Sequence, residues 1–303
     1  MRNFLSVRAD SDIHVYLLHN DLTPQDQLYL QDTAMSYHQT IHFLFIDKGM
    51  FPQSLPTTSA WSLETYFRLM LVDILPPDVK RILYLDVDMV INKPVKELYN
   101  TDFEEYYFCA CRDMPTVFPF PDSRNDLFRE HIQKGFTYFN AGMMLWNIEK
   151  LRGKYSFKDY MELAHSLNYQ MLAPDQDILN YMHWNQVKFL DEYQFDLFAK
   201  MAYNNGIHYE DVKKETTIIH FAGMKPWEGE YIHYNIEKLW WDYAKLTPFY
   251  TELMEEFIHN CITNPLVGDT LYSLSCDKKN LAAELNKSTA VCQKLLHMLE
   301  GSK

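Results

Sequence analysis

The chain has 303 residues, 47% of them hydrophobic, which suffices for one large domain or for one domain with a smaller appendage. Its formal net charge of −13 disfavours non-specific binding to nucleic acid or to anionic lipid, since both need clustered Lys and Arg. No apolar run approaches the ~20 residues of a membrane-spanning helix, and the five cysteines lack metal-site spacing, so we expect a cytoplasmic enzyme or binding protein with free thiols.

Short apolar strands alternate with amphipathic segments over the first third of the chain. The stretch "TTSAWSLETYFRLMLVDILPP" begins with candidate N-caps, carries apolar residues at helical spacing and ends at Pro76 and Pro77. Strands are expected at 13–18, 41–46 and 81–88, with helices at 24–37 and 57–77 between them. This alternation indicates an α/β fold with a mainly parallel central sheet.

The pattern changes after Pro94. Two strands, "YYFCAC" (106–111) and "FTYFNAGMMLWNI" (136–148), are separated by a polar segment that contains prolines. Helices are expected near 156–172 and 176–183, another strand at 216–221, and a loosely amphipathic helical region at 266–300. We therefore expect a main domain over 1–250 and a C-terminal helical extension over 251–303.

The third strand runs into two aspartates, Asp86 and Asp88, in "RILYLDVDMVINKP". Ligand sites in open α/β sheets lie at the carboxyl ends of strands, and residues i and i+2 of a strand point the same way. Both carboxylates can therefore converge on one hard divalent cation, which removes their repulsion and offers positive charge to a phosphate. The alternative is a solvated strand end, because D-x-D is a short and common pattern.

A second cluster lies in "HFAGMKPW" (220–227), where His220 ends a strand. Gly223 permits close approach of the backbone to a ligand, and Lys225 could contact phosphate as a point charge. Each residue alone is also explained by a core histidine, a turn glycine and a surface lysine. Together with the two aspartates, the imidazole favours Mn²⁺ over Ca²⁺, since imidazole is a poor ligand for harder ions.

The stretch "APDQDILNYM" (173–182) predicts a polar helix N-terminus. Helix capping explains at least one of its acids, Asp175 or Asp177. Three consecutive polar side chains, with Gln176 between the two acids, exceed what one cap requires. The stretch is therefore a candidate binding site as well as a helix start.

Two further features stand out in apolar surroundings. Asn140, Ala141 and Gly142 interrupt the strand at 136–148, which suggests close approach of a ligand or of backbone, with a β-bulge as the alternative. Arg68 lies on a largely apolar helix, and a buried Arg needs an anionic partner. That partner is either an acidic side chain or a phosphate or sugar hydroxyl of a ligand.

Taken together, these motifs resemble the family 8 glycosyltransferases, retaining nucleotide-sugar enzymes that include glycogenin and bacterial lipopolysaccharide galactosyl- and glucosyltransferases. The resemblance runs from about residue 12 to about residue 245. Its motifs occur in the family order: "RLML", "YLDVDMVI", "YFNAGMMLWN", "DQDILN" and "HFAGMKPW". Each is weak alone, and the ordered set is specific.

The resemblance implies a nucleotide-diphosphosugar transferase (GT-A) fold, a catalytic domain over 1–250, a Mn²⁺ or Mg²⁺ ion and a UDP-sugar donor. It assigns Asp86, Asp88 and His220 as metal ligands. Gly223 and Lys225 would hold the diphosphate, and Gln176, with Asp175, would sit beside the reacting sugar carbon. The remaining contacts to the donor would come from Arg68, Val87, Asp113, Asn140, Ala141 and Asp175.

The chain departs from the family at its start. Family members open with a strand that binds uracil and ribose, whereas "MRNFLSVRADSDIHVYLLHNDL" resembles the end of the first helix followed by the second strand. The first strand is expected to be absent, most simply through a truncated reading frame. The uracil preference then rests on the family alone.

The implied activity is transfer of glucose or galactose from a UDP-sugar to a glycan or lipopolysaccharide-type acceptor, with retention of configuration. Retaining hydrolases place two carboxylates about 5 Å apart, one of which acts as nucleophile. No such pair is evident in this sequence and Gln176 is a poor nucleophile, so we expect front-face substitution. The alternatives are a non-catalytic sugar-nucleotide or glycan-binding protein and a sugar nucleotidyltransferase. No nucleic-acid partner is expected, and peripheral membrane contact through the C-terminal helices is left open.

Overall fold

The computed structural model describes residues 12–58, 62–113, 126–223, 225–228 and 235–263, with short pieces between 276 and 293. The chain divides into two compact units, one formed by 1–223 and 234–247 and the other by 224–233 and 248–303. This division leaves the predicted boundary of a catalytic domain at residue 250 a prediction. The expected absence of the first family strand concerns residues 1–11, which lie outside the described residues.

The first unit begins with a strand–helix–strand element that matches the expected ranges. Strands β1 (His14–His19) and β2 (Thr40–Phe45) pair in parallel, and α1 (Pro24–Ser36) connects them. Helix α1 starts at a capping box, in which Thr23 and Asp26 satisfy each other's backbone amides.

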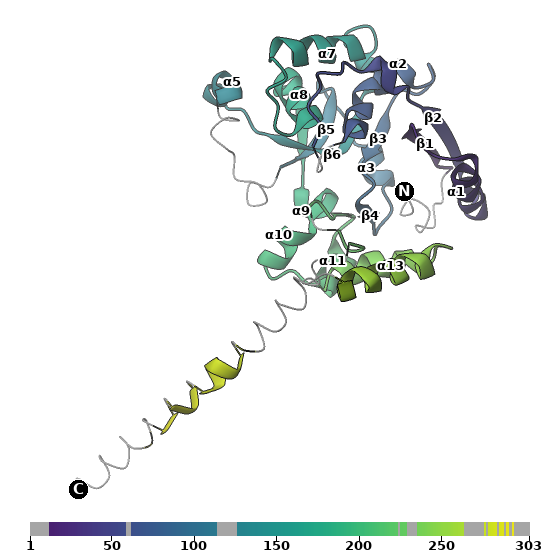
Figure 1. Ribbon diagram of the computed structural model, residues 1–303. Helices are drawn as coiled ribbons and strands as arrows, with labels where there is room; N and C mark the ends of the chain where they lie inside the picture. The colour runs from purple at the N-terminus through teal and green to yellow at the C-terminus, as the bar shows by residue number, and fades with distance from the viewer. Residues whose placement is uncertain are drawn as a thin grey trace. The chain divides into compact units, whose positions relative to one another are not determined.

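The central sheet has the strand order β3 (Ile82–Leu85), β6 (Phe139–Trp146), β5 (Phe108–Arg112) and β7 (Val187–Leu190). Figure 1 shows β3, β6 and β5 lying together. All eight residues of β6 are buried, as expected for the middle of a sheet covered on both faces.

The expectation of a mainly parallel sheet is wrong in this detail. Strand β6 runs antiparallel to both β3 and β5, and only β5 and β7 pair in parallel. Antiparallel neighbours need no crossover helix, and the sequence after Pro94 indeed lacks the strand–helix alternation that imposes parallel pairing.

A second, smaller sheet extends the first unit. It consists of β4 (Met89–Ile91), β9 (Ile218–His220) and β8 (Leu197–Phe198), with β9 in the middle. Strand β9 was expected, whereas β4 and β8 were not, because three and two residues are too short to show periodicity.

The helices predicted for this part of the chain are present, with changes in length. The helix expected at 57–77 is a 3₁₀ helix, η2 (Leu63–Met70), continued by α2 (Leu71–Ile74). Helices α7 (Phe157–Ser166) and α8 (Pro174–His183) follow, and α8 packs on β6 and η2. The main apolar core lies between these elements.

The remaining elements are short connections and the C-terminal helices. They are η1 (Lys48–Met50), α3 (Lys96–Tyr99), α5 (Arg129–Gln133), α6 (Ile148–Leu151), α9 (Glu192–Phe195), α10 (Ala199–Asn204), α11 (Tyr209–Glu215), α12 (Glu237–Ala244) and α13 (Tyr250–Thr263). Within the expected helical region at 266–300, residues 278–283 are helical and the segments 264–275 and 294–303 lie outside the described residues.

The expectation of free thiols is met at Cys109 and Cys111, which are buried and unpaired on β5. None of the described helices is long and apolar enough to cross a membrane.

Candidate active site

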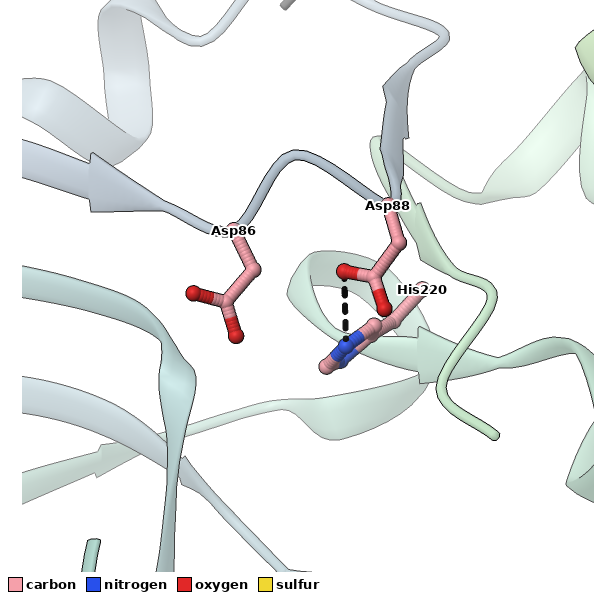
Figure 2. A group of neighbouring side chains, drawn as sticks. All are labelled: Asp86, Asp88 and His220. Atoms are coloured by element: carbon pink, nitrogen blue, oxygen red, sulfur yellow. Dashed lines mark ion pairs between the residues drawn. The ribbon is translucent and has the colours of Figure 1, made fainter. Parts of the chain in front are cut away.

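Asp86, Asp88 and His220 converge at the point where the two sheets meet. Asp86 follows β3, Asp88 precedes β4, and His220 ends β9, which pairs with β4. Figure 2 shows the Asp88 carboxylate facing the imidazole ring, with Asp86 at the end of the neighbouring strand. One potential ligand atom from each residue lies within 4.8 Å of the other two.

The imidazole of His220 lies between two carboxylates. Its Nε2 is 3.3 Å from Asp88 Oδ1, and its Nδ1 is 2.9 Å from Asp196 Oδ1. Burial alone would lower the pKa of His220, but Asp88 and Asp196 outweigh this effect and raise the pKa to about 10. The cluster therefore attracts positive charge to this position.

Backbone hydrogen bonds hold both aspartates in place. The amide of Asp86 donates to the carbonyl of Gly142 on β6 (2.8 Å), and the amide of Phe221 donates to the carbonyl of Asp88 (2.9 Å). Two carboxylates and one imidazole form a donor set suited to a borderline divalent ion such as Mn²⁺. The chemistry of these residues thus fits the metal site expected from the sequence.

Arg68 is buried, and two acidic side chains pair with it, so the acidic partner that the sequence offered as one alternative is present. Its guanidinium lies 2.8 Å from Asp86 Oδ1 and 2.8 Å from Asp175 Oδ2, and it donates to the carbonyl of Ala141. It also stacks over the ring of Tyr84, whose hydroxyl donates to Asp86 at 2.9 Å. Arg68 therefore ties α8 to the carboxyl end of β3.

The two acids at the start of α8 have different environments. Asp177 is buried and accepts hydrogen bonds from the hydroxyl of Tyr138 (2.5 Å) and from the amides of Leu172 (2.7 Å) and Ala173 (3.0 Å). Its bonds to these two amides stabilise the start of α8, so Asp177 is the acid whose presence helix capping explains. Burial raises the pKa of Asp175 to about 6, against the lowering effect of Arg68.

Gln176 lies within a polar network formed by residues predicted for the donor site. Its Oε1 accepts from the amide of Ala141 (2.8 Å) and from Asn140 Nδ2 (3.2 Å). Its Nε2 donates to Asp113 Oδ2 at 3.2 Å, and Asn140 Nδ2 also reaches Asp113 Oδ1 at 3.4 Å. The structure thus brings together Asp113, Asn140, Ala141 and Gln176 from three elements.

Gly142 explains the small residues of β6. A Cβ atom at this position would lie 2.7 Å from His220 Cε1 and 2.8 Å from Asn140 Oδ1, closer than real Cβ contacts. The β-bulge that the sequence offered as an alternative is also present in part, because the pairing of β5 with β6 is irregular between Ala110 and Arg112. The glycine is required by close approach of the His220 imidazole.

The other three predicted site residues are Val87, Gly223 and Lys225. Val87 lies between the two aspartates and is 67% exposed. Gly223 has a φ of +84°, a left-handed conformation that favours glycine. Lys225 belongs to the second compact unit, so its contact with a diphosphate remains a prediction.

The sequence analysis missed three residues of this region. Tyr84 could have been found from the strand period, because it lies two residues before Asp86 and points the same way. Asn180 exchanges two hydrogen bonds with the backbone of Phe139 and so anchors α8 to β6. Asp196 carried no signal in the sequence, since it is a single acid in the short segment between α9 and β8.

Comparison with known families and proteins agrees with these features. The family model described as Glycosyl transferase family 8 matches residues 2–230. A lipopolysaccharide 1,3-galactosyltransferase of Salmonella typhimurium is 28% identical over 68% of this chain and 61% of its own length. A lipopolysaccharide 1,2-glucosyltransferase of Escherichia coli is 28% identical over 65% of this chain and 59% of its own length. The chain thus spans about three fifths of each relative.

Solved structures show the same fold. The galactosyltransferase LgtC, in complex with donor and acceptor sugar analogues, aligns with a TM-score of 0.62 at 22% identity, over 79% of this chain and 87% of LgtC. The apo form of the bifunctional glycosyltransferase WbbM aligns with a TM-score of 0.64 at 18% identity, over 82% of this chain and 47% of its own. These likenesses confirm the expected GT-A architecture.

Proposed function

Since the chain belongs to glycosyltransferase family 8 and is a glycosyltransferase, we propose that it transfers glucose or galactose from a UDP-sugar to a glycan, with Mn²⁺ bound at Asp86, Asp88 and His220. The observation that carries the proposal is the convergence of these three side chains beside the polar network of Gln176. A metal site and a sugar-sized set of hydrogen-bonding groups are the two parts that such a transfer needs.

A divalent ion held by Asp86, Asp88 and His220 would supply positive charge to stabilise the leaving diphosphate. The chain's own residues orient the donor around it. Arg68 holds Asp86 and Asp175 in fixed positions through its two ion pairs. The carboxylate of Asp113 and the amide of Asn140 offer hydrogen bonds to sugar hydroxyls. Lys225 is proposed to contact the diphosphate.

Retention by front-face substitution is part of this proposal. In a double displacement, a carboxylate would have to attack the sugar carbon, and both candidate carboxylates of α8 are engaged. Asp175 is paired with Arg68, and Asp177 is held by a tyrosine hydroxyl and two backbone amides. Gln176 is uncharged, so it is assigned to positioning of the sugar and of the incoming acceptor hydroxyl.

The proposed donor sugar and acceptor are taken from the names of two relatives. One is named for transfer of galactose and the other for transfer of glucose, both to lipopolysaccharide. A lipopolysaccharide-type acceptor and either hexose are therefore proposed here. The preference for uracil follows from the family, and the expected cytoplasmic location remains a prediction.

The test is release of UDP from UDP-glucose and UDP-galactose, with Mn²⁺ or with EDTA. Wild type should release UDP only with Mn²⁺, and Asp88→Asn should be slower by at least about 100-fold, as for other groups that stabilise charge in the transition state. Asp26→Asn, in the capping box of α1 far along the chain, is the matched control and should retain wild-type activity.

Three outcomes would change the proposal. Release that is equal in EDTA would contradict the metal role. Binding of Mn²⁺ and UDP-sugar without turnover in the presence of glycan acceptors would favour the non-catalytic binding protein. A glycosyl adduct on Asp175 or Asp177, found by mass spectrometry of the trapped enzyme, would replace front-face substitution with a double displacement.

A further inference from the structure

Asp196 is a buried carboxylate that touches the metal-binding imidazole from behind. It lies at the junction where α9 ends and β8 begins, and it is only 1% exposed. Strand β8 pairs in parallel with β9, with Phe198 opposite His220. This pairing brings the carboxylate two residues earlier to the far nitrogen of the ring, with Oδ1 2.9 Å from Nδ1.

The imidazole of His220 is confined on several sides. The ring of Phe198 packs against it edge-on, with centroids 4.8 Å apart and planes at 78°. Gly142 leaves no room for a Cβ beside Cε1. Packing fixes the plane of the ring, but it does not decide which edge carries nitrogen toward Asp88. That choice needs a directional hydrogen bond at Nδ1, because a flipped ring would occupy almost the same volume.

The energetic cost of Asp196 also indicates a role beyond packing. A buried carboxylate loses its hydration, and an apolar side chain of similar size is often equally stable or more stable at such a position. Among the described residues, its second oxygen, Oδ2, has no hydrogen-bond partner. Asp196 is thus held at an unfavourable place by its contact with His220.

We propose that Asp196 is a positioning residue for the metal site: its carboxylate accepts the Nδ1–H hydrogen bond of His220 and so presents Nε2 to the ion shared with Asp86 and Asp88. This inference rests on the proposed metal site. Carboxylates and carbonyls that hydrogen-bond to a ligating histidine fix its orientation and increase its basicity, and their loss typically costs about 10–100-fold in metal affinity.

The experiment measures the Mn²⁺ dissociation constant of the full chain by isothermal titration calorimetry. Asp196→Ala should raise the Kd about 10–100-fold, and Asp196→Asn, which retains an acceptor oxygen without charge, should raise it about 3–10-fold. In UDP release, the Mn²⁺ concentration for half-maximal rate should rise in the same proportion. The rate at saturating Mn²⁺ should change much less, which a general loss of folding would not produce.

Asn92→Ala is the matched control. Its amide Nδ2 donates to the carbonyls of Val212, Lys213 and Thr216 at the entry to β9, so its loss destabilises the same strand without touching His220. This variant should have a lower Tm and an unchanged Mn²⁺ Kd.

The outcomes separate this inference from the proposed function. If wild type binds no Mn²⁺, the metal site and the role of Asp196 both fail. If wild type binds Mn²⁺ and both Asp196 variants bind it within twofold of wild type, the positioning role alone is overturned. Should Asp196→Ala not fold, the Kd of Asp196→Asn decides by the same criterion.

Discussion

Replacement of Gly142 by Ala tests the arrangement of the site with the smallest change the chain allows. The added Cβ would lie 2.7 Å from His220 Cε1, 2.8 Å from Asn140 Oδ1 and 2.9 Å from Met89 Cε. Carbon atoms in contact normally stay about 3.5–4.0 Å apart, so the imidazole must move by roughly 0.8 Å or more. The end of the Met89 side chain can rotate away, whereas the ring is held from two sides.

The displacement has a cost in stability and a cost in binding. Overpacking of a filled site typically costs about 1–3 kcal/mol, which for a chain of this size corresponds to a Tm lower by about 2–10 °C. The same movement breaks the 2.9 Å contact of His220 with Asp196 and the 3.3 Å contact with Asp88. We therefore expect the Mn²⁺ Kd to rise at least roughly tenfold.

Thermal unfolding in EDTA and calorimetric titration with Mn²⁺ measure the two effects separately. Gly49→Ala is the matched control, because its Cβ would meet only the exposed side chain of Asp47, at 3.2 Å or more. It should leave the Kd unchanged. A Gly142→Ala protein with wild-type Kd and Tm would refute the conclusion that β6 packs directly against the His220 imidazole.

Three further substitutions test buried charges. Asp177→Ala removes an acceptor for one hydroxyl and two amides, so urea unfolding should show a loss of about 2–4 kcal/mol; a changed Mn²⁺ Kd would contradict its purely structural role. Arg68→Met leaves Asp86 and Asp175 without their buried partner and should cost about 3–5 kcal/mol; an unchanged urea midpoint would show that the pairs contribute nothing. Burial raises the pKa of Glu237 to about 7, above its unfolded value of 4.5, so its contribution to stability is fully present below pH 4.5 and is lost as pH rises through 7. At pH 8, Glu237→Gln should therefore have a higher urea midpoint than wild type, and its free energy of unfolding should be greater by about 1 kcal/mol after allowance for solvent screening. An equal difference in free energy at pH 4.5 would contradict this cause.

Local patterns in the sequence were sufficient for most of the elements that build the site. The strand before Asp86, the helix that begins at Pro174 and the strand that ends at His220 all lie within a few residues of their expected ranges. Their hydrophobic period and their prolines are local signals, which do not depend on the rest of the chain. The sequence also supplied the candidate metal ligands by residue type. The expectation that Asp86 and Asp88 share one face of a strand is wrong, because Val87 and Asp88 form a turn between β3 and β4.

Strand direction and partner choice were decided by the tertiary structure. The residue pattern within a strand does not specify its partners, so β6 could be recognised as a buried strand, whereas its antiparallel pairing with both β3 and β5 was not predicted. The same holds for Arg68. Its need for an anionic partner was evident from its apolar helix, yet only packing could identify Asp86 and Asp175 as the acids that pair with it.

Residue types and their spacing along the chain were enough to predict the family, the order of its motifs and the residues that can bind a metal. The orientation of the His220 imidazole, in contrast, depends on contacts that form only when the chain folds. Asp196 lies 24 residues away from it, and Gly142 belongs to another sheet. Contacts between such distant segments arise when strands pair and cores close, and the orientation of a side chain is set by all of its neighbours at once.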